Sequence, residues 1–311
     1  MGKIATREAY GNTLAKLALE NKDIVVVDAD LAGSTMTKKF KEVAPERHFD
    51  MGIAESNMIT VSAGLAANGK IPYCSTFAVF ASGRVYDQIR ASVAYTNLPV
   101  KICATHAGIT VGEDGATHQA LEDLSLMRAM PNMTVIQPCD GAETQAVIEA
   151  IAKYNKPVYV RLGRSAVDDV YQPGQCKFEI GKGVVIHEGE KDVLMIATGL
   201  MVQQSLNAIE TLKQNGINPT LINIHTIKPL DEELIVKYAK DCKVVVTLEE
   251  HSIIGGLGSA VSETLAKNCP RKQIFIGTND TFGESGKPAQ LMEKYGLSSE
   301  KIVERILKEV K

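Results

Sequence analysis

Short apolar runs alternate with longer amphipathic stretches along the first half of the chain. Four runs rich in β-branched residues predict buried strands at 24–27, 100–103, 134–136 and 158–160. The stretches from Thr6 to Glu20 and from Glu143 to Tyr154 carry apolar side chains at helical spacing. This alternation predicts a parallel sheet with helices on both of its faces.

The alternation resumes in the second half after a glycine-rich pause. The pause runs from Val170 to Gly183 and indicates a linker. Further strands are predicted at 193–197, 220–224, 244–248 and 273–276. Because 311 residues exceed one ordinary domain core, we expect two domains, residues 1–175 and 176–311. Both are expected to be α/β, with mainly parallel sheets flanked by helices.

Composition and charge narrow the class of protein. Apolar residues make up 45% and charged residues 23%, the balance of a globular protein. A net charge of −3 gives no reason to expect nucleic acid or an anionic membrane as a partner. The six cysteines are scattered, and no stretch approaches the roughly 18 apolar residues of a membrane helix. We therefore expect a cytoplasmic protein with reduced thiols and no metal site of its own.

The segment from Thr105 to Gln119 is unusually polar for its place between a strand and a helix. It holds two histidines, two acids and three glycines. Glycine lets a backbone approach a ligand closely, and histidine moves protons near neutral pH. Ligands of parallel sheets bind at the carboxyl ends of strands, where Asp28 and Asp30 also fall. The favoured interpretation is a functional site, and the alternative is an ordinary surface loop.

For two further candidates, a purely structural role is as well supported by the sequence as a functional role, or better supported. Glu55 lies between an apolar strand end and a helix of small residues, where burial favours the protonated carboxyl. The alternative is an acid that stabilises a helix N-terminus. Phe77 and Phe80 are three residues apart, and such a pair is more often part of a core than of a cofactor pocket.

The segment from Glu249 to Ser259 is similar to a dinucleotide-binding fingerprint. Gly256 and Gly258 match its first two glycines, but Val261 stands where glycine or alanine is required. We therefore favour a tight strand-to-helix turn over a nucleotide site.

Taken together, these segments resemble the transketolase family in order and spacing. The most specific string is Gly112-Glu113-Asp114-Gly115-Ala116-Thr117-His118-Gln119. It is accompanied by Ala5-Thr6-Arg7, Asp28-Ala29-Asp30-Leu31, Gly52-Ile53-Ala54-Glu55, Thr76-Phe77 with Phe80, Leu121-Glu122-Asp123-Leu124 and Arg128-Ala129-Met130-Pro131-Asn132. The match begins where a full transketolase is about half complete, and no Gly-Asp-Gly motif is found. The resemblance implies a pyrimidine-binding domain and a transketolase C-terminal domain, with the diphosphate domain on a second chain.

The resemblance also implies thiamine diphosphate as cofactor, with its Mg²⁺ or Ca²⁺ held by the partner chain. Glu55 matches the carboxyl that hydrogen-bonds the pyrimidine nitrogen N1′, a task suited to a partly desolvated glutamate. Phe77 and Phe80 match the aromatic pocket around the pyrimidine, and Asp30 an aspartate close to the cofactor. Gly83 departs from the family, because many relatives carry a tyrosine in this part of the pocket wall.

Other matches imply sugar phosphates as substrates. Asp114 matches the residue that reads the hydroxyl beside the reacting carbon. His118 matches a residue near the donor's reacting groups and is, with Glu55, a catalytic candidate. Arginine, histidine and hydroxyl groups are apt phosphate donors. The positions that match the family's phosphate grip are Arg7, Ser34, His106 and Arg164.

On this resemblance we expect the C-terminal subunit of a two-chain transketolase. It would transfer a two-carbon ketol unit from a ketose phosphate to an aldose phosphate, in the pentose phosphate pathway or in the use of modified sugars. Its partner would be an N-terminal transketolase subunit, in a dimer of heterodimers.

Three alternatives remain. They are a beta-type subunit of a 2-oxo-acid dehydrogenase, a chain like deoxyxylulose-phosphate synthase, and a non-catalytic paralogue. His106 and the Glu113-Asp114 pair argue against the first two, and intact Glu55, Asp114 and His118 argue against the third.

Overall fold

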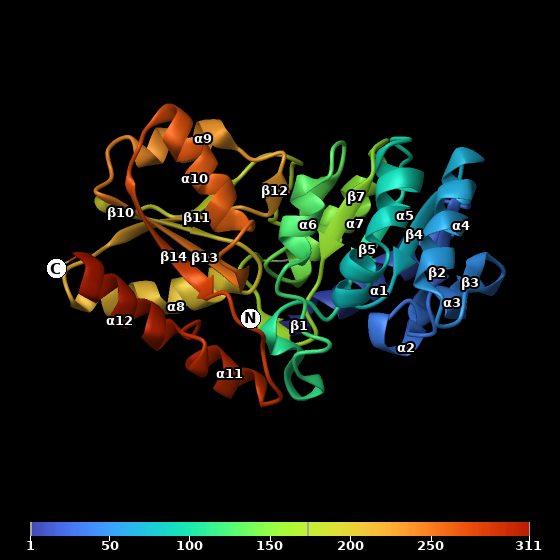
Figure 1. Cartoon of the computed structure of the whole chain (residues 1–311), viewed down its shortest axis with the longest axis horizontal. Helices are drawn as coiled ribbons and strands as arrows, with labels where there is room; N and C mark the ends of the chain where they lie inside the picture. Colours follow the sequence, from blue (N-terminus) through green and yellow to red (C-terminus); the bar gives the residue numbers. More distant parts are fainter. Residues whose placement is uncertain (1, 173, 311) are drawn as a thin grey trace.

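The computed structural model describes residues 2–172 and 174–310. Its first lobe is built on a seven-stranded sheet in the order β12-β6-β7-β5-β4-β2-β3 (Figure 1). Neighbouring strands are parallel except for the pair β12 and β6. The four strands predicted for this half are confirmed as β2, β5, β6 and β7, and all of their residues are buried. The bounds are β2 Ile24–Asp28, β3 His48–Asp50, β4 Ile71–Ser75, β5 Lys101–Ala104, β6 Thr134–Ile136, β7 Val158–Arg161 and β12 Thr226–Lys228.

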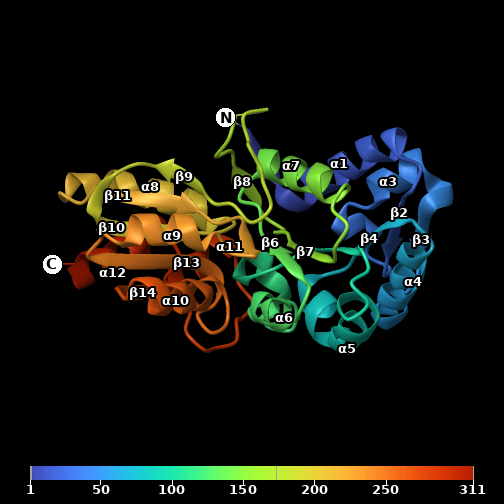
Figure 2. The ribbon, with the colours of Figure 1, turned by 90° about the horizontal axis from the view of Figure 1, so that it is seen from above.

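Helices cover both faces of this sheet, as Figure 2 shows from above. One face carries α1 (Thr6–Glu20), α3 (Lys38–Val43) and α7 (Gly141–Ile151), and the other α4 (Glu55–Ala67), α5 (Tyr86–Gln88) and α6 (Asp123–Ala129). Helix α1 has the predicted bounds. Helix α7 begins two residues before the predicted Glu143 because the side chain of Asp140 accepts a hydrogen bond from the Glu143 N–H. Shorter pieces are β1 Lys3–Ala5, α2 Ala32–Thr35, η1 Pro45–Arg47, η2 Phe80–Arg84, η3 Ile89–Ala94, η4 Ile109–Asp114 and β8 Ala166–Asp168.

The second lobe repeats the architecture on a five-stranded sheet in the order β14-β13-β10-β11-β9. Its strands are parallel except for the antiparallel edge strand β9. Helices α8 and α12 lie on one face and α9 and α10 on the other (Figure 1). The bounds are β9 Val184–His187, β10 Glu190–Ala197, α8 Met201–Gln214, β11 Pro219–Asn223, α9 Glu232–Ala239, β13 Val244–Ser252, α10 Leu257–Asn268, β14 Lys272–Thr278, α11 Pro288–Lys294 and α12 Ser299–Val310.

The strands predicted for the second half are confirmed as β10, β11, β13 and β14, with one correction. Strand β13 continues to Ser252 instead of ending at Leu248, so Glu249, Glu250 and His251 belong to the strand. Their side chains are buried against neighbouring elements, and a run of charged residues hides this continuation from a hydrophobicity pattern.

The two lobes interlock. Strand β12 lies in the second half of the sequence but pairs with β6 of the first sheet, with Thr226 opposite Ile136. One hydrophobic cluster runs from Met127 of the first lobe to Val261 of the second. The expected linker from Val170 to Gly183 contains no helix or strand among its described residues, and Pro173 lies outside them. In the described ranges, no helix combines the length and apolar character that crossing a bilayer requires.

Candidate functional site

Four aromatic side chains meet at the carboxyl edge of the first sheet. Phe77 and Phe80 follow β4, and His106 and His118 lie in the loop after β5. The rings of Phe77 and His106 stack with centroids 3.9 Å apart, and those of Phe77 and Phe80 lie 6.1 Å apart. The ring of His118 lies steeply inclined to both phenylalanine rings, with its centroid 5.6 Å from Phe80 and 6.2 Å from Phe77. Four predicted site residues from two loops therefore form one cluster.

Glu55 joins this cluster through a residue that the sequence analysis missed. It begins helix α4 and is only 3% exposed, so its expected burial is confirmed. Its Oε1 accepts a hydrogen bond of 2.7 Å from Nη1 of Arg84. The same guanidinium lies over the ring of Phe80, 4.3 Å from its centroid. The spacing of Phe80 and Arg84, four residues apart in a helical stretch, is a signal that could have linked them.

Arg84 ends η2, a short π-helix that begins at Phe80. Such widened turns are rare in proteins as a whole, and those that occur are often found at functional sites. A Cβ built on Gly83 would meet open space. The planar group over Phe80 is the Arg84 guanidinium.

His106 is a neutral imidazole at ordinary pH. Its burial, together with the positive charges of Arg7 and Arg164, lowers its pKa to about 3. Its Nδ1 lies 2.9 Å from the Thr105 hydroxyl. If that hydroxyl donates to Nδ1, the ring proton is on Nε2, which is then a donor. The backbone of His106 adopts φ +57°, an uncommon conformation that turns the ring toward Phe77.

A positive patch adjoins His106. Arg7 donates through Nη1 to the carbonyl of Ser34 at 2.6 Å and through Nε to the carbonyl of Arg164 at 3.2 Å. Burial and the charge of Arg164 lower the pKa of Arg7. Arg164 donates to Val111 O at 2.5 Å and pairs with exposed Glu113 at 3.1 Å. In the part of the chain that the structure describes, Arg7 forms no ion pair, so the patch has spare positive charge.

The two remaining candidates, Asp30 and Asp114, lie at the rim. Both side chains are exposed, and within residues 2–172 and 174–310 neither carboxylate has a hydrogen bond or ion pair. The loop of Asp30 is held by buried Asp28, which accepts from Leu31 N–H at 2.7 Å and from the Thr35 hydroxyl at 2.8 Å. The backbone N–H of Asp30 donates to Asp50 at 2.9 Å. A buried acid thus anchors the loop while Asp30 stays free.

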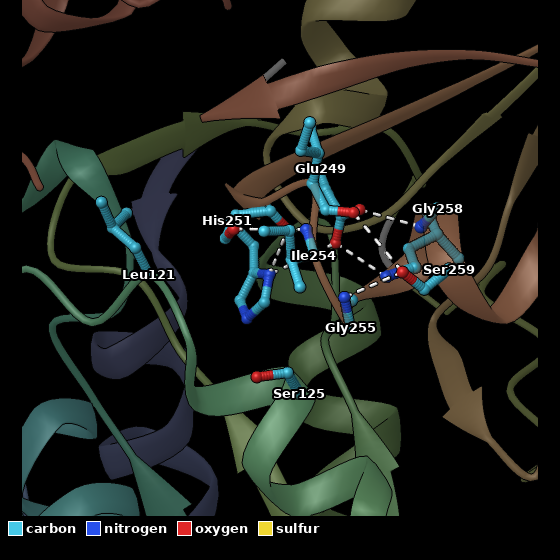
Figure 3. Close-up of polar contacts among 12 residues, drawn as sticks. Leu121, Ser125, Glu249, His251, Ile254, Gly255, Gly258 and Ser259 are labelled. Atoms are coloured by element: carbon cyan, nitrogen blue, oxygen red, sulfur yellow. Dashed lines mark hydrogen bonds and ion pairs between the residues drawn. The ribbon is translucent and has the colours of Figure 1, made fainter. Parts of the chain in front are cut away.

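The glycine-rich turn of the second lobe is held in place by the buried side chain of Glu249. Figure 3 shows the carboxylate of Glu249 directed at the start of helix α10. Its oxygens accept from Leu257 N–H at 2.7 Å and Gly258 N–H at 2.8 Å. Burial raises the pKa of Glu249 to about 7. The interpretation of this segment as a strand-to-helix turn is confirmed, because strand β13 ends at Ser252, helix α10 begins at Leu257 and Glu249 caps the first N–H groups of that helix.

The described ranges contain no cluster of three or more His, Cys, Asp and Glu side chains placed to hold a metal ion. The groups of this site are one buried carboxyl, aromatic faces, two imidazoles and two or more arginines. Such a set suits an organic ring and an anion.

Comparison with known proteins agrees with the fold. The family profile for the transketolase pyrimidine binding domain matches residues 2–169, and that for the transketolase C-terminal domain matches residues 181–302. The chain is 52% identical over 307 residues to a putative transketolase C-terminal section of Methanocaldococcus jannaschii, covering 98% of this chain and 96% of the relative.

Two further matches are of similar extent. A 6-deoxy-6-sulfo-D-fructose transketolase subunit of Clostridium sp. (strain MSTE9) is 43% identical over 297 residues, which is 96% of this chain and 92% of the relative. A solved structure described as a split gene transketolase in an inactive beta4 tetramer has a TM-score of 0.91 and 50% identity. That match covers 99% of this chain and 98% of the solved one.

Proposed function

The chain belongs to the transketolase family, and from this premise we propose that it is the C-terminal subunit of a two-chain transketolase. The assembled enzyme transfers a two-carbon ketol unit between phosphorylated sugars in the cytoplasm. Two relatives that are themselves a C-terminal section and a subunit match over more than nine-tenths of their lengths, which supports the two-chain form.

The observation that carries the proposal is the arrangement of Glu55, Phe80 and Arg84. A buried carboxyl and an aromatic face here hold a planar, nitrogen-bearing cation. The aminopyrimidine of thiamine diphosphate is also planar and presents a ring nitrogen that can share a proton with a carboxyl. The donor set of the pocket therefore fits this ring. Thiamine diphosphate, when bound, supplies a nucleophilic carbon that accepts the ketol unit.

The residues of this chain divide the remaining tasks. Glu55 would share a proton with the pyrimidine nitrogen, and Phe77 and Phe80 would form the aromatic wall against the ring. Neutral His106 and neighbouring His118 line the side where the sugar binds and offer ring N–H donors. Asp114 and Asp30, both free at the rim, contact sugar hydroxyls and the edge of the cofactor pocket.

Phosphate recognition falls to Arg7 and Arg164, with Ser34 and His106 beside them. Arg7 contributes a charge without a carboxylate partner in the described residues, which favours an anion at this place. The diphosphate of the cofactor and its Mg²⁺ belong to the N-terminal partner. Two copies of each chain assemble, and the beta4 tetramer of the similar split-gene protein is inactive, in line with a need for the second kind of chain.

The test is a reconstitution with an N-terminal transketolase subunit, thiamine diphosphate and Mg²⁺. We expect ketol transfer from a ketose phosphate to an aldose phosphate only when both chains are present, and a two-plus-two mass by light scattering. Robust turnover by this chain alone, or an active one-to-one complex, would contradict the proposal.

The same preparation separates the alternatives. Condensation of pyruvate with glyceraldehyde 3-phosphate would indicate a deoxyxylulose-phosphate synthase-like enzyme. Decarboxylation of a 2-oxo acid alone would indicate a dehydrogenase subunit. A complex that binds the cofactor yet turns over none of these substrates would indicate a non-catalytic paralogue.

A further inference from the structure

The loop from Thr105 to Gln119, which carries His106, Asp114 and His118, is anchored from the second lobe. Glu250 of strand β13 is only 2% exposed, and its Oε1 accepts a hydrogen bond of 2.6 Å from the Thr110 N–H. Gly108 packs so closely on the Glu250 carboxyl that a Cβ at this glycine would overlap it. Gly108 also has φ +82°, so two independent reasons require glycine here.

The loop needs such an anchor because its own backbone is permissive. Gly108, Gly112 and Gly115 all have positive φ, between +75° and +85°. Segments with several such glycines lose much conformational entropy on ordering, and contacts from outside must offset that loss. The Thr110 N–H is buried, so without the Glu250 acceptor it would be an unsatisfied donor.

A fully buried arginine ties the anchor to the far end of the loop. Nη2 of Arg161 donates to the carbonyls of Ala120 and Glu250, both at 3.0 Å. Its Nε pairs with Asp123 at 2.8 Å. Beyond this point the Ser252 N–H donates to Leu121 O at 2.8 Å, where Figure 3 shows the end of β13 facing α6. The second lobe thus holds the polar loop at Thr110 and the chain just beyond its end at Leu121.

We propose that Glu250 is a positioning residue for substrate binding: from the second lobe it fixes the loop that presents His106, Asp114 and His118. The expected change in substrate binding rests on the proposed function. The anchoring of the loop by Glu250 does not depend on that function. Among the described residues, the Glu250 side chain has no hydrogen bond or ion pair with the aromatic cluster or the arginine patch, so it acts through the Thr110 backbone.

The chain offers a closely matched control in the adjacent residue. Glu249 lies on the same strand and is equally buried, and burial raises the pKa of both carboxyls to about 7. Its hydrogen bonds, however, go to Leu257 and Gly258 of helix α10 in its own lobe. A general loss of stability would follow from substitution of either glutamate, whereas only substitution of Glu250 should displace the loop.

The experiment compares Glu250→Ala, Glu250→Gln and Glu249→Ala with the natural chain. The first measurement is amide hydrogen exchange of the chain alone, resolved to residues 108–119. We expect Glu250→Ala to speed exchange at the Thr110 amide at least tenfold. Glu250→Gln retains a carbonyl acceptor for that amide and should change exchange less than threefold. Glu249→Ala should speed exchange at the start of α10 and leave residues 108–119 unchanged.

The second measurement is kinetic and uses the reconstituted two-chain enzyme. Glu250→Ala should raise KM for the ketose phosphate about tenfold, with thiamine diphosphate affinity unchanged, and Glu250→Gln should restore it. Equal exchange in all variants, or equal effects of Glu249→Ala on residues 108–119, would overturn the anchoring role. A mobile loop with an unchanged KM would overturn the positioning role. If no preparation turns over sugars, the proposed function fails, and the exchange data still decide the anchor.

Discussion

The loop from Thr105 to Gln119 and the segment from Glu249 to Ser259 look alike in sequence but differ in structure. Each belongs to the carboxyl-end region of a parallel strand, is rich in glycine and carries both histidine and acids. In the second segment the acids bond to backbone N–H groups, Glu249 to Leu257 and Gly258, and Glu250 to Thr110. In the first, Asp114 stays exposed and His118 faces Phe80.

The difference teaches how to tell a site from its scaffold. A polar residue at a strand end does not by itself indicate a functional site, because buried acids also cap helices and anchor loops. What decides it is whether the polar groups are already satisfied inside the protein. In the segment around Glu249 both acids are satisfied inside the protein, whereas among the described residues the carboxylates of Asp30 and Asp114 keep bonding capacity for a ligand.

The largest expected effect is that of Glu55→Gln, with Glu249→Gln as the comparison variant from the second segment. Loss of an acid–base group typically lowers a rate about a hundred- to ten-thousandfold, and we expect this for Glu55→Gln in the assembled enzyme. The measurement is deuterium exchange at the thiazolium carbon of bound thiamine diphosphate. Glu249→Gln should lower the melting temperature but leave exchange per folded molecule intact. An unchanged exchange rate in Glu55→Gln would remove this residue from the proposed role.

A smaller effect is expected from the arginines of the two regions. Arg164→Ala should raise KM for a phosphorylated acceptor about ten- to a hundredfold, because a charge-assisted hydrogen bond contributes about 1.5–3 kcal/mol. A small unphosphorylated aldehyde should be unaffected. The control is Arg128→Ala, since Arg128 donates to Gly255 O at 2.6 Å and pairs with Glu263 in the scaffold. Equal losses for both acceptors would show that Arg164 supports the loop through its bond to Val111.

Arg84 should oppose cofactor binding slightly. Its guanidinium occupies the Glu55 oxygen and the Phe80 face that the proposed function assigns to the aminopyrimidine, and its side chain is 49% exposed. Replacing such a half-exposed ion pair is worth about 1 kcal/mol, or about fivefold in affinity. Arg84→Ala should therefore tighten thiamine diphosphate binding about fivefold by calorimetry on the assembled enzyme. Exposed Arg90 provides the control variant. Weaker binding would mean that Arg84 belongs to the wall of the loaded pocket.

The smallest effect concerns pH. Because the pKa of buried Glu249 is raised to about 7, its folded-state proton stabilises the chain at low pH, and this contribution is lost as pH rises through about 7. His106 has a pKa lowered to about 3, so its contribution is present above about 6.5 and is lost as pH falls. Glu249→Gln should therefore lower the melting temperature about 2 °C more at pH 5 than at pH 8. His106→Asn should show the reverse, and equal losses at both pH values would contradict the assignment.

Much of the fold and several candidates were predictable from local pattern. The alternation of apolar runs indicated eight strands that the structure contains, since periodicity reports which face of each element is buried. The string from Gly112 to Gln119, the pair Phe77 and Phe80, and Glu55 stood out for residue type and spacing, and their local backbone places them at the sheet edge.

The contacts that make a site of them depended on tertiary structure. Arg84 meets Glu55 across 29 residues, Glu250 meets Thr110 across 140, and β12 joins a sheet of the other lobe. A hydrophobic pattern shows that a group is covered but not which distant residue covers it. Sequence by itself determined the elements, the family resemblance and the chemistry available at the strand ends. Only the packing of the two lobes decided which polar groups are satisfied internally and which remain for a ligand.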